Sequence, residues 1–178
     1  MNPLQKVARR MIELAFDLSV AAISFFNDMS RYHREVGALR QCPSGSLGRE
    51  IADALDSRGL SLVPGYESHD LKHVLLGFDM TPEGEIRMQA FMIGNRNYSL
   101  PSFAIFLFGA VLLPDLWLTF TADFAKGRKT RPIASWTIER YAGQGLSVLR
   151  DSLPTWRAAA YSGLNTCAGD RRLTEVWS

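Results

Sequence analysis

The chain has 178 residues, which is most simply one domain and is long enough to bury a core without disulfide or metal staples. Hydrophobic residues make up 47% and charged residues 21%, as in ordinary globular proteins, and the net charge of +2 gives no electrostatic reason to expect nucleic acid as a partner. Cys42 and Cys167 lie far apart and form no CxxC pair. The start leads straight into an amphipathic pattern without a secretory signal, so we expect reduced thiols in a cytoplasmic protein.

Helical periodicity dominates the first sixty residues. Apolar residues recur at helical spacing from about residue 3 to 32, which predicts one long helix or two with a bend. A break rich in proline, glycine and serine follows at residues 42–45. Ser46 has the side chain of a helix N-cap, and Gly59 is expected to end the helix that Ser46 starts.

Two further helices frame a polar motif. The first is predicted over residues 67–76 and is expected to stop at Gly77. The second is predicted to start with Thr81 as N-cap and Pro82 in the first helical position, and to continue through Met92.

The most hydrophobic segment spans residues 99–120, with an interruption at Pro114 and Asp115. A membrane span needs roughly 20 apolar residues with few charges, and an aspartate at mid-bilayer costs roughly 3 kcal/mol. We therefore expect core helices or an apolar pocket here, with a transmembrane span as the alternative. Basic residues at 126–131 close the segment and suit either a solvated turn or contact with anionic lipid.

The last helix is predicted over residues 135–153, weakened by Gly143 and Gly145. Residues 155–178 show little pattern and are expected to form a loosely attached tail. Strand signals are nearly absent along the chain. The sequence thus predicts an all-α fold of about six or seven helices, with one domain over residues 1–154.

The chemistry of the chain is concentrated in His69, Asp70, His73 and Glu85. The chain has only three histidines, and two of them stand four residues apart, on one face of a helix. Asp70 lies beside that face, and Glu85 must come from the next helix, which we expect to pack antiparallel to the first. Two imidazoles and two carboxylates can converge on one divalent metal.

Two other interpretations of the motif stand beside the metal site. The first is a solvated helix face with two surface histidines, because pairs at this spacing often arise by chance. The second is a zinc peptidase, which uses H-E-x-x-H with the glutamate as general base. Here the shorter Asp70 holds that position, and nothing nearby in the sequence resembles a protease cleft.

The motif resembles the signature of a family of ubiquinone (coenzyme Q) biosynthesis proteins, usually called Coq-four. That signature is H-D-x-x-H followed by eleven residues and a glutamate, which the four residues above match with the spacing intact. The resemblance covers roughly residues 40–135. It includes the flanks of the motif and the helix start upstream, at residues 43–48, 74–77, 84–86 and 89–91.

The resemblance implies an all-helical domain, a divalent metal, most often zinc, held by those four residues, and a hydrophobic cavity for a polyprenyl chain. It also implies peripheral association with membranes. In ubiquinone biosynthesis it implies removal of the ring carboxyl group with hydroxylation at that carbon, and organisation of the biosynthetic complex. The chain departs from the family in lacking a mitochondrial presequence and in its divergent tail, which suggests a bacterial member.

Two functions therefore follow from the sequence and the resemblance. One is a metal-dependent lyase or oxidative decarboxylase that acts on the head group of a polyprenylated aromatic, with the prenyl tail in a tunnel lined by residues 103–120. The other is a non-catalytic prenyl-lipid carrier or scaffold with a structural metal. Either can work as a homodimer or within a biosynthetic complex. Four protein ligands close a tetrahedral zinc site, whereas catalysis needs an open position, and the same donors also suit iron, cobalt or manganese.

Overall fold

The computed structural model describes residues 3–26, 30–63 and 65–153, and the predicted tail at 155–178 lies outside these ranges. The described residues form helices and contain no strand, which confirms the all-α class. The predicted first segment is two helices. The elements in chain order are α1 (Pro3–Phe26), α2 (Ser30–Leu39), α3 (Leu47–Asp56), α4 (Glu67–Leu76), α5 (Pro82–Gly94), α6 (Leu100–Leu112), the 3-10 turn η1 (Pro114–Leu116), α7 (Trp117–Lys129), α8 (Ile138–Tyr141) and α9 (Leu146–Asp151).

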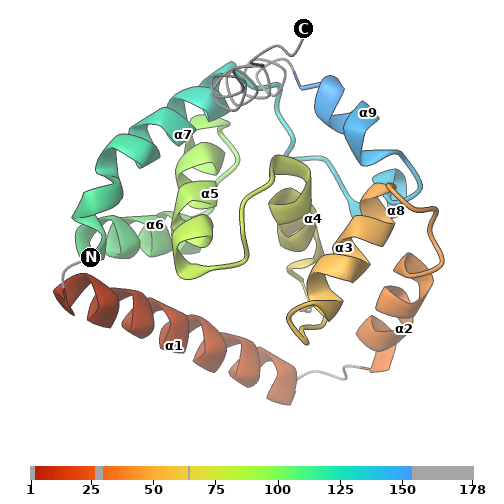
Figure 1. Cartoon of the computed structure of the whole chain (residues 1–178), viewed down its shortest axis with the longest axis horizontal. Helices are drawn as coiled ribbons and strands as arrows, with labels where there is room; N and C mark the ends of the chain where they lie inside the picture. Colours follow the sequence, from red (N-terminus) through yellow and green to blue (C-terminus); the bar gives the residue numbers. More distant parts are fainter. Residues whose placement is uncertain (1–2, 27–29, 64, 154–178) are drawn as a thin grey trace, which may run out of the picture.

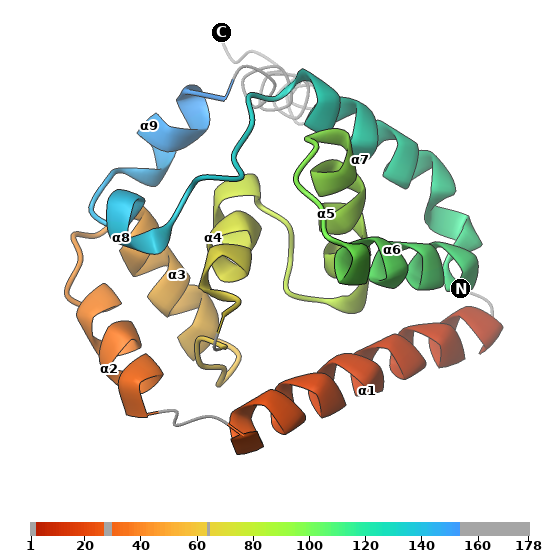
Figure 2. The same cartoon turned by 180° about the vertical axis from the view of Figure 1, so that it is seen from behind.

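Helix α5 connects two apolar cores. In Figures 1 and 2, α6 and α7 lie on one side of α5, α4 lies on the other with α3, α2, α8 and α9 beyond it, and α1 runs along one edge. Met88, Phe91 and Met92 of α5 are buried in a cluster with α2, α3, α4, α8 and α9. Ile86 and Ala90 are buried in a second cluster with α1, α6 and α7. Both halves of the molecule therefore depend on the position of α5.

Local capping sets the helix boundaries around the motif, as predicted. The Ser46 side chain accepts a hydrogen bond from the backbone amide of Arg49 at the start of α3, and Thr81 accepts one from Gly84 at the start of α5. Gly77 ends α4 with a left-handed φ of 68°, which glycine adopts without the cost that a side chain would bring.

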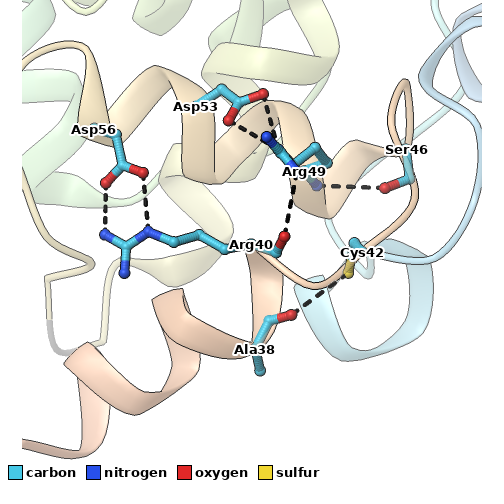
Figure 3. A network of polar contacts seen from close by, with 7 residues as sticks. All are labelled: Ala38, Arg40, Cys42, Ser46, Arg49, Asp53 and Asp56. Atoms are coloured by element: carbon cyan, nitrogen blue, oxygen red, sulfur yellow. Dashed lines mark hydrogen bonds and ion pairs between the residues drawn. The ribbon is translucent and has the colours of Figure 1, made fainter.

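Ion pairs connect α2 to α3 (Figure 3). Arg40, just beyond α2, donates to both carboxylate oxygens of Asp56 at 2.6 and 2.9 Å, and Arg49 pairs with Asp53 within α3 at 2.9 Å. These pairs are exposed to water, which screens the attraction, so they contribute little to stability. Helix α3 ends at Asp56, three residues before the Gly59 that was predicted to end it.

Helices α5 and α7 cross at glycine residues, so that their backbones touch. A Cβ atom at Gly94 would lie 2.1 Å from the carbonyl oxygen of Phe124, and one at Gly127 would lie 2.0 Å from that of Phe91. The buried amide of Asn95 then donates to backbone carbonyl groups at the end of α7 and beyond it. The crossing therefore leaves no room for a larger residue at either glycine.

The single helix predicted over residues 135–153 is wrong. This segment forms two short helices, α8 and α9, and the chain between them hydrogen-bonds to the start of α3. The amide of Leu47 donates to the carbonyl of Gln144 at 2.8 Å, and Ser46 and Gly145 form an antiparallel bridge. A continuous helix would use these backbone groups for its own hydrogen bonds.

The apolar segment is broken where it was predicted to break. Helix α6 ends before Pro114, and α7 follows the turn η1. Within the described residues, no helix by itself has the length and the apolar composition that a membrane crossing requires. Only Ser102–Leu112 and Pro114–Lys129 taken together meet that requirement, and they are bent by 101° relative to each other.

Candidate metal centre

Three side chains converge between α4 and α5. The Nε2 atoms of His69 and His73 lie 3.1 Å apart, and Oε2 of Glu85 lies 3.0 Å from the first and 2.9 Å from the second. The three atoms form a nearly equilateral triangle. A divalent ion just outside its plane would contact all three at about 2.0–2.2 Å, the usual range for zinc. The described residues thus contain a three-ligand cluster.

Helices α4 and α5 run in the same direction, not antiparallel as expected (Figures 1 and 2). His69 lies in the first turn of α4 and Glu85 in the first turn of α5, so these two ligands come from the same end of the helices, and His73 follows one turn after His69. An antiparallel pair would have placed Glu85 near the end of α4. The connecting residues 77–81 run back along α4, which they can do because an extended residue spans about 3.3–3.6 Å.

Two hydrogen bonds orient the donor atoms. His73 Nδ1 lies 3.0 Å from the carbonyl oxygen of Phe78. Because a carbonyl only accepts, Nδ1 donates the proton, and Nε2 of the neutral ring directs its lone pair to the triangle. The Nε2 group of Gln89 donates to Oε1 of Glu85 at 2.7 Å and leaves Oε2 to face the histidines. Such supporting contacts are typical of metal sites.

Neither supporting group was predicted from the sequence. The Phe78 carbonyl has no signature in the sequence, because every residue carries one. Gln89 stands four residues after Glu85 on the same helix, so its spacing was a usable signal.

The electrostatics of the centre favour a carboxylate next to a positive charge. His73 and Glu85 are buried, with 3% and 7% of their surface exposed. Burial alone would raise the pKa of Glu85, but hydrogen bonds with His69 and His73 outweigh burial and lower it. Burial alone would lower the pKa of His69, but the hydrogen bond and the charge of Glu85 raise it. Either a proton or a metal ion can supply the positive charge.

Asp70 lies beside the triangle and is not part of it. Its Oδ2 atom is buried, and no described residue donates a hydrogen bond to it. Burial raises the pKa of Asp70 to about 6, because the charged form is poorly solvated. A buried carboxylate oxygen without a partner fits a site in which a cation, or a water molecule bound to one, completes the hydrogen bonding. Of the four predicted residues, three converge and Asp70 adjoins them.

The donor set fits a divalent metal. Two imidazole nitrogens and one carboxylate oxygen are ligands of zinc, and equally of iron, cobalt and manganese. Three protein ligands leave at least one position for Asp70, water or another molecule.

The C-terminal end of α4 is held in place by α9. Arg150 of α9 donates to the carbonyl groups of Val74 and Leu75 at 2.8 and 3.1 Å.

Gly109 lies in the segment that was expected to line a prenyl tunnel, and at this position α6 meets α5 closely. A Cβ atom at Gly109 would lie 2.3 Å from Cδ1 of Ile86, so α6 packs directly against α5. The outer face of α6 is exposed instead, and it carries large apolar side chains. These are Leu100, Phe103, Leu107, Phe108 and Val111.

A cleft of about 380 Å³ lies where α5 ends and α6 begins. Its lining residues are Ile93, Tyr98, Leu100 and Phe103. Along α5, Glu85, Gln89 and Ile93 follow one another at intervals of four residues, so one row of side chains leads from the triangle to the cleft. At a rise of about 1.5 Å per residue, that row is about 12 Å long.

Comparison with known proteins finds a likeness in structure. The chain matches no protein-family model and no curated protein. Its fold is similar to the crystal structure of a protein from Nostoc punctiforme that bears the name "Putative ubiquinone biosynthesis protein". The TM-score is 0.55 at 22% sequence identity, over 86% of this chain and 82% of that one. At this identity the likeness shows a shared fold.

Proposed function

We propose that this chain is a metal-dependent protein of ubiquinone or related prenylquinone biosynthesis. In this proposal it acts on the ring head group of a polyprenylated aromatic precursor, in a step of the decarboxylation or hydroxylation type. The observation that carries the proposal is the convergence of His69, His73 and Glu85 within 3.1 Å of one another. The name of the structural neighbour and the resemblance of the motif point to the same pathway.

The chain's own residues prepare the site for an acidic aromatic. A divalent ion bound there supplies a Lewis acid for the oxygen atoms of a ring carboxylate or hydroxyl group. Phe78 fixes the tautomer of His73, and Gln89 holds Glu85, so the donor atoms are aligned in advance. Loss of the carboxyl group breaks one carbon–carbon bond, releases carbon dioxide and leaves an electron pair that a proton takes up. Hydroxylation at the same carbon requires dioxygen as a further reactant, and its second oxygen atom leaves either as water, with two electrons from an added reductant, or as hydrogen peroxide.

The apolar surface near the site accounts for the rest of the proposed substrate. The cleft at Ile93 and Phe103 lies about two turns beyond Glu85 along α5 and can take part of a prenyl tail. The exposed face of α6 can then rest on a membrane surface. The last turn of α7 carries Lys126, Arg128 and Lys129, which favour anionic lipid. We propose zinc as the ion and peripheral membrane contact as the route of the substrate.

One observation favours the second function, a lipid carrier or scaffold with a structural metal. Asp70 stands beside the triangle with an unpartnered carboxylate oxygen. If Asp70 becomes the fourth ligand, a tetrahedral site is closed, as structural zinc sites are. The two functions therefore differ in the identity of the fourth ligand.

The test is the stoichiometry and coordination of the metal in the purified full-length chain. We expect one zinc per chain, loss of that zinc in His73→Ala, and an X-ray absorption spectrum with an exchangeable oxygen beside the three protein ligands. A polyprenylated hydroxybenzoate incubated with the loaded protein and oxygen should then lose the mass of its carboxyl group. Four protein ligands and an unchanged substrate would support the carrier. Absence of a site-specific metal under metal-replete conditions would contradict both functions.

A further inference from the structure

We propose that α1 is a dimerisation element, and that its exposed apolar stripe pairs antiparallel with the same helix of a second copy of this chain. The proposal stands apart from the metal centre and from the pathway. It rests on the periodicity, the width and the flanking charges of that stripe.

The stripe follows a heptad repeat. Its described members are each more than half exposed, and they are Val7, Met11, Leu14, Leu18 and Phe25. The intervals of four, three, four and seven residues are those of the a and d positions of a coiled coil. In the sequence, Leu4 and Ala21 occupy the remaining a and d positions of the same repeat. The apolar pattern thus continues over three heptads.

The opposite face of α1 is already used within the chain. Ala8 and Ile12 are buried in the cluster that contains Ile86. Arg9 pairs with Glu83 and with Asp115. At 100° per residue, Ala8, Ile12 and Arg9 lie roughly 90°, 130° and 170° from the centre of the stripe. It therefore faces away from the body, and Figure 1 shows α1 along the outer edge of the molecule.

The narrow width of the stripe indicates that a second helix packs against it. All five exposed residues fall within about 60° of the helix circumference, the narrow seam of a coiled coil, whereas an apolar face that packs on a broad surface covers at least about 100°. Helices that lie on membranes also carry mainly basic residues on the polar face. Here Arg10 and Glu13 stand together and pair at 2.5 Å, so their charges cancel.

The flanking positions select the antiparallel orientation. In the register above, Arg10 and Asp17 both occupy position g, one heptad apart, while Ala8, Ala15 and Ala22 occupy position e. A parallel pair would place g opposite e, and so each charge opposite an alanine. An antiparallel pair places g opposite g, so that the arginine of one copy can meet the aspartate of the other.

The size of the contact is sufficient for a specific pair. Helix α1 has 24 residues and is therefore about 36 Å long. Two such stripes placed face to face cover on the order of 1,000 Å², the lower limit for a specific interface. Two-fold symmetry buries the same stripe on both copies and leaves no open end.

Sedimentation equilibrium of the full-length chain tests the proposal. We expect a dimer for the natural chain and a dissociation constant at least tenfold larger for the double variant Leu14→Glu with Leu18→Glu. The matched control is Leu107→Glu with Val111→Glu, which places the same charges on the exposed face of α6 and should leave the dimer intact. Far-ultraviolet circular dichroism should show equal helix content in all three proteins.

The charge pattern tests the orientation. Arg10→Asp and Asp17→Arg should each weaken the dimer, and the combination of both changes should restore it. A monomeric natural chain, a seam variant that still dimerises, or an α6 control that dissociates as well would each overturn the proposal. A monomer whose vesicle binding is lost in the seam variant would overturn it too, because the stripe would then belong to a membrane. If the variant with both charge changes forms a weaker dimer than either single variant, the antiparallel pairing is wrong.

Discussion

His73 shows how a backbone group can determine the chemistry of a side chain. The carbonyl of Phe78 accepts from Nδ1, so the opposite nitrogen is left to bind an ion. Gln89 has the corresponding role for Glu85. The ligand types and their spacing could be predicted from the sequence, because the turn of a helix fixes which residues share a face. The supporting carbonyl could not, because its position depends on the path of the chain after Gly77.

Replacing Gln89 by methionine should weaken metal binding by about 10–100-fold, the usual effect of removing a supporting contact. Methionine has a similar length but no donor, so Oε1 of the buried Glu85 loses its partner and the carboxylate loses its orientation. A chelator competition titration measures the change. Gln144→Met, at an exposed position, should bind metal as the natural chain does. Equal affinities for both variants would show that Gln89 has no part in the site.

Replacing Asp70 by asparagine should stabilise the metal-free protein, and the gain should grow as the pH rises from about 4 to about 6. Burial raises the pKa of Asp70 from 3.8 to about 6, so the folded state holds this proton more tightly than the unfolded chain. The contribution of the group to stability is therefore full below pH 3.8 and is lost as the pH rises through 6. Asparagine avoids that loss, which amounts to about 3 kcal/mol.

Urea denaturation of metal-free natural protein and Asp70→Asn at pH 4 and pH 7.5 measures this effect. The gain in unfolding free energy should appear at the higher pH and be small at the lower one. The same variant should bind metal no better than the natural chain. A gain that is independent of pH would mean that the charged carboxylate of Asp70 is not the cause of the loss of stability.

Helix boundaries that depend on neighbouring residues could be predicted from the sequence, and those that depend on contacts with distant segments could not. The caps at Ser46 and Thr81 and the stop at Gly77 depend on neighbouring residues, and the structure confirms all three. The error at residues 135–153 has a distant cause, because the start of α3 takes up backbone groups that a continuous helix would need. The direction of α5 relative to α4 also depends on the course of a loop, which periodicity does not report.

Alanine at Gly94 or Gly127 should destabilise the protein by about 2–3 kcal/mol, as overpacking in a core does. At both positions the new methyl group would meet a backbone carbonyl at close to 2 Å, and a helix backbone cannot move aside as a side chain can. Gly37→Ala in α2 is the matched control, because nothing lies within 4 Å of its added Cβ. It should be neutral or stabilise by up to about 1 kcal/mol. Urea denaturation curves of the three variants make the comparison, and similar effects at all three sites would contradict the close crossing.

At the scale of the whole molecule, two exposed apolar surfaces lie on different helices. The face of α6 is broad and is followed by the basic last turn of α7, whereas the stripe on α1 is narrow and has balanced charges. The sequence showed that residues 99–120 are apolar, but it could not show which side of α6 faces the core. That depends on Ile86, which occupies the space beside Gly109.

Vesicle flotation should show which of the two apolar surfaces binds a membrane. The natural chain is expected to float with anionic vesicles at low salt, and less so as salt rises, because screening weakens the attraction of basic residues to lipid. Leu107→Glu with Val111→Glu should reduce flotation, since both side chains lie on the exposed face of α6. Leu14→Glu with Leu18→Glu on α1 should float as the natural chain does. If the α6 variant floats as the natural chain does, the proposed contact of α6 with the membrane is contradicted.

The loop between α4 and α5 works as a tether of fixed length. It must return about 15 Å along the two helices to bring Glu85 level with His69. It is pinned on the way, because the carbonyl of Met80 accepts from Arg58 at 2.6 Å and the carbonyl of Phe78 accepts from His73. One residue fewer would leave Glu85 short of the histidines by roughly 3 Å. A deletion among the eleven residues between His73 and Glu85 is therefore expected to weaken metal binding even where every ligand is kept.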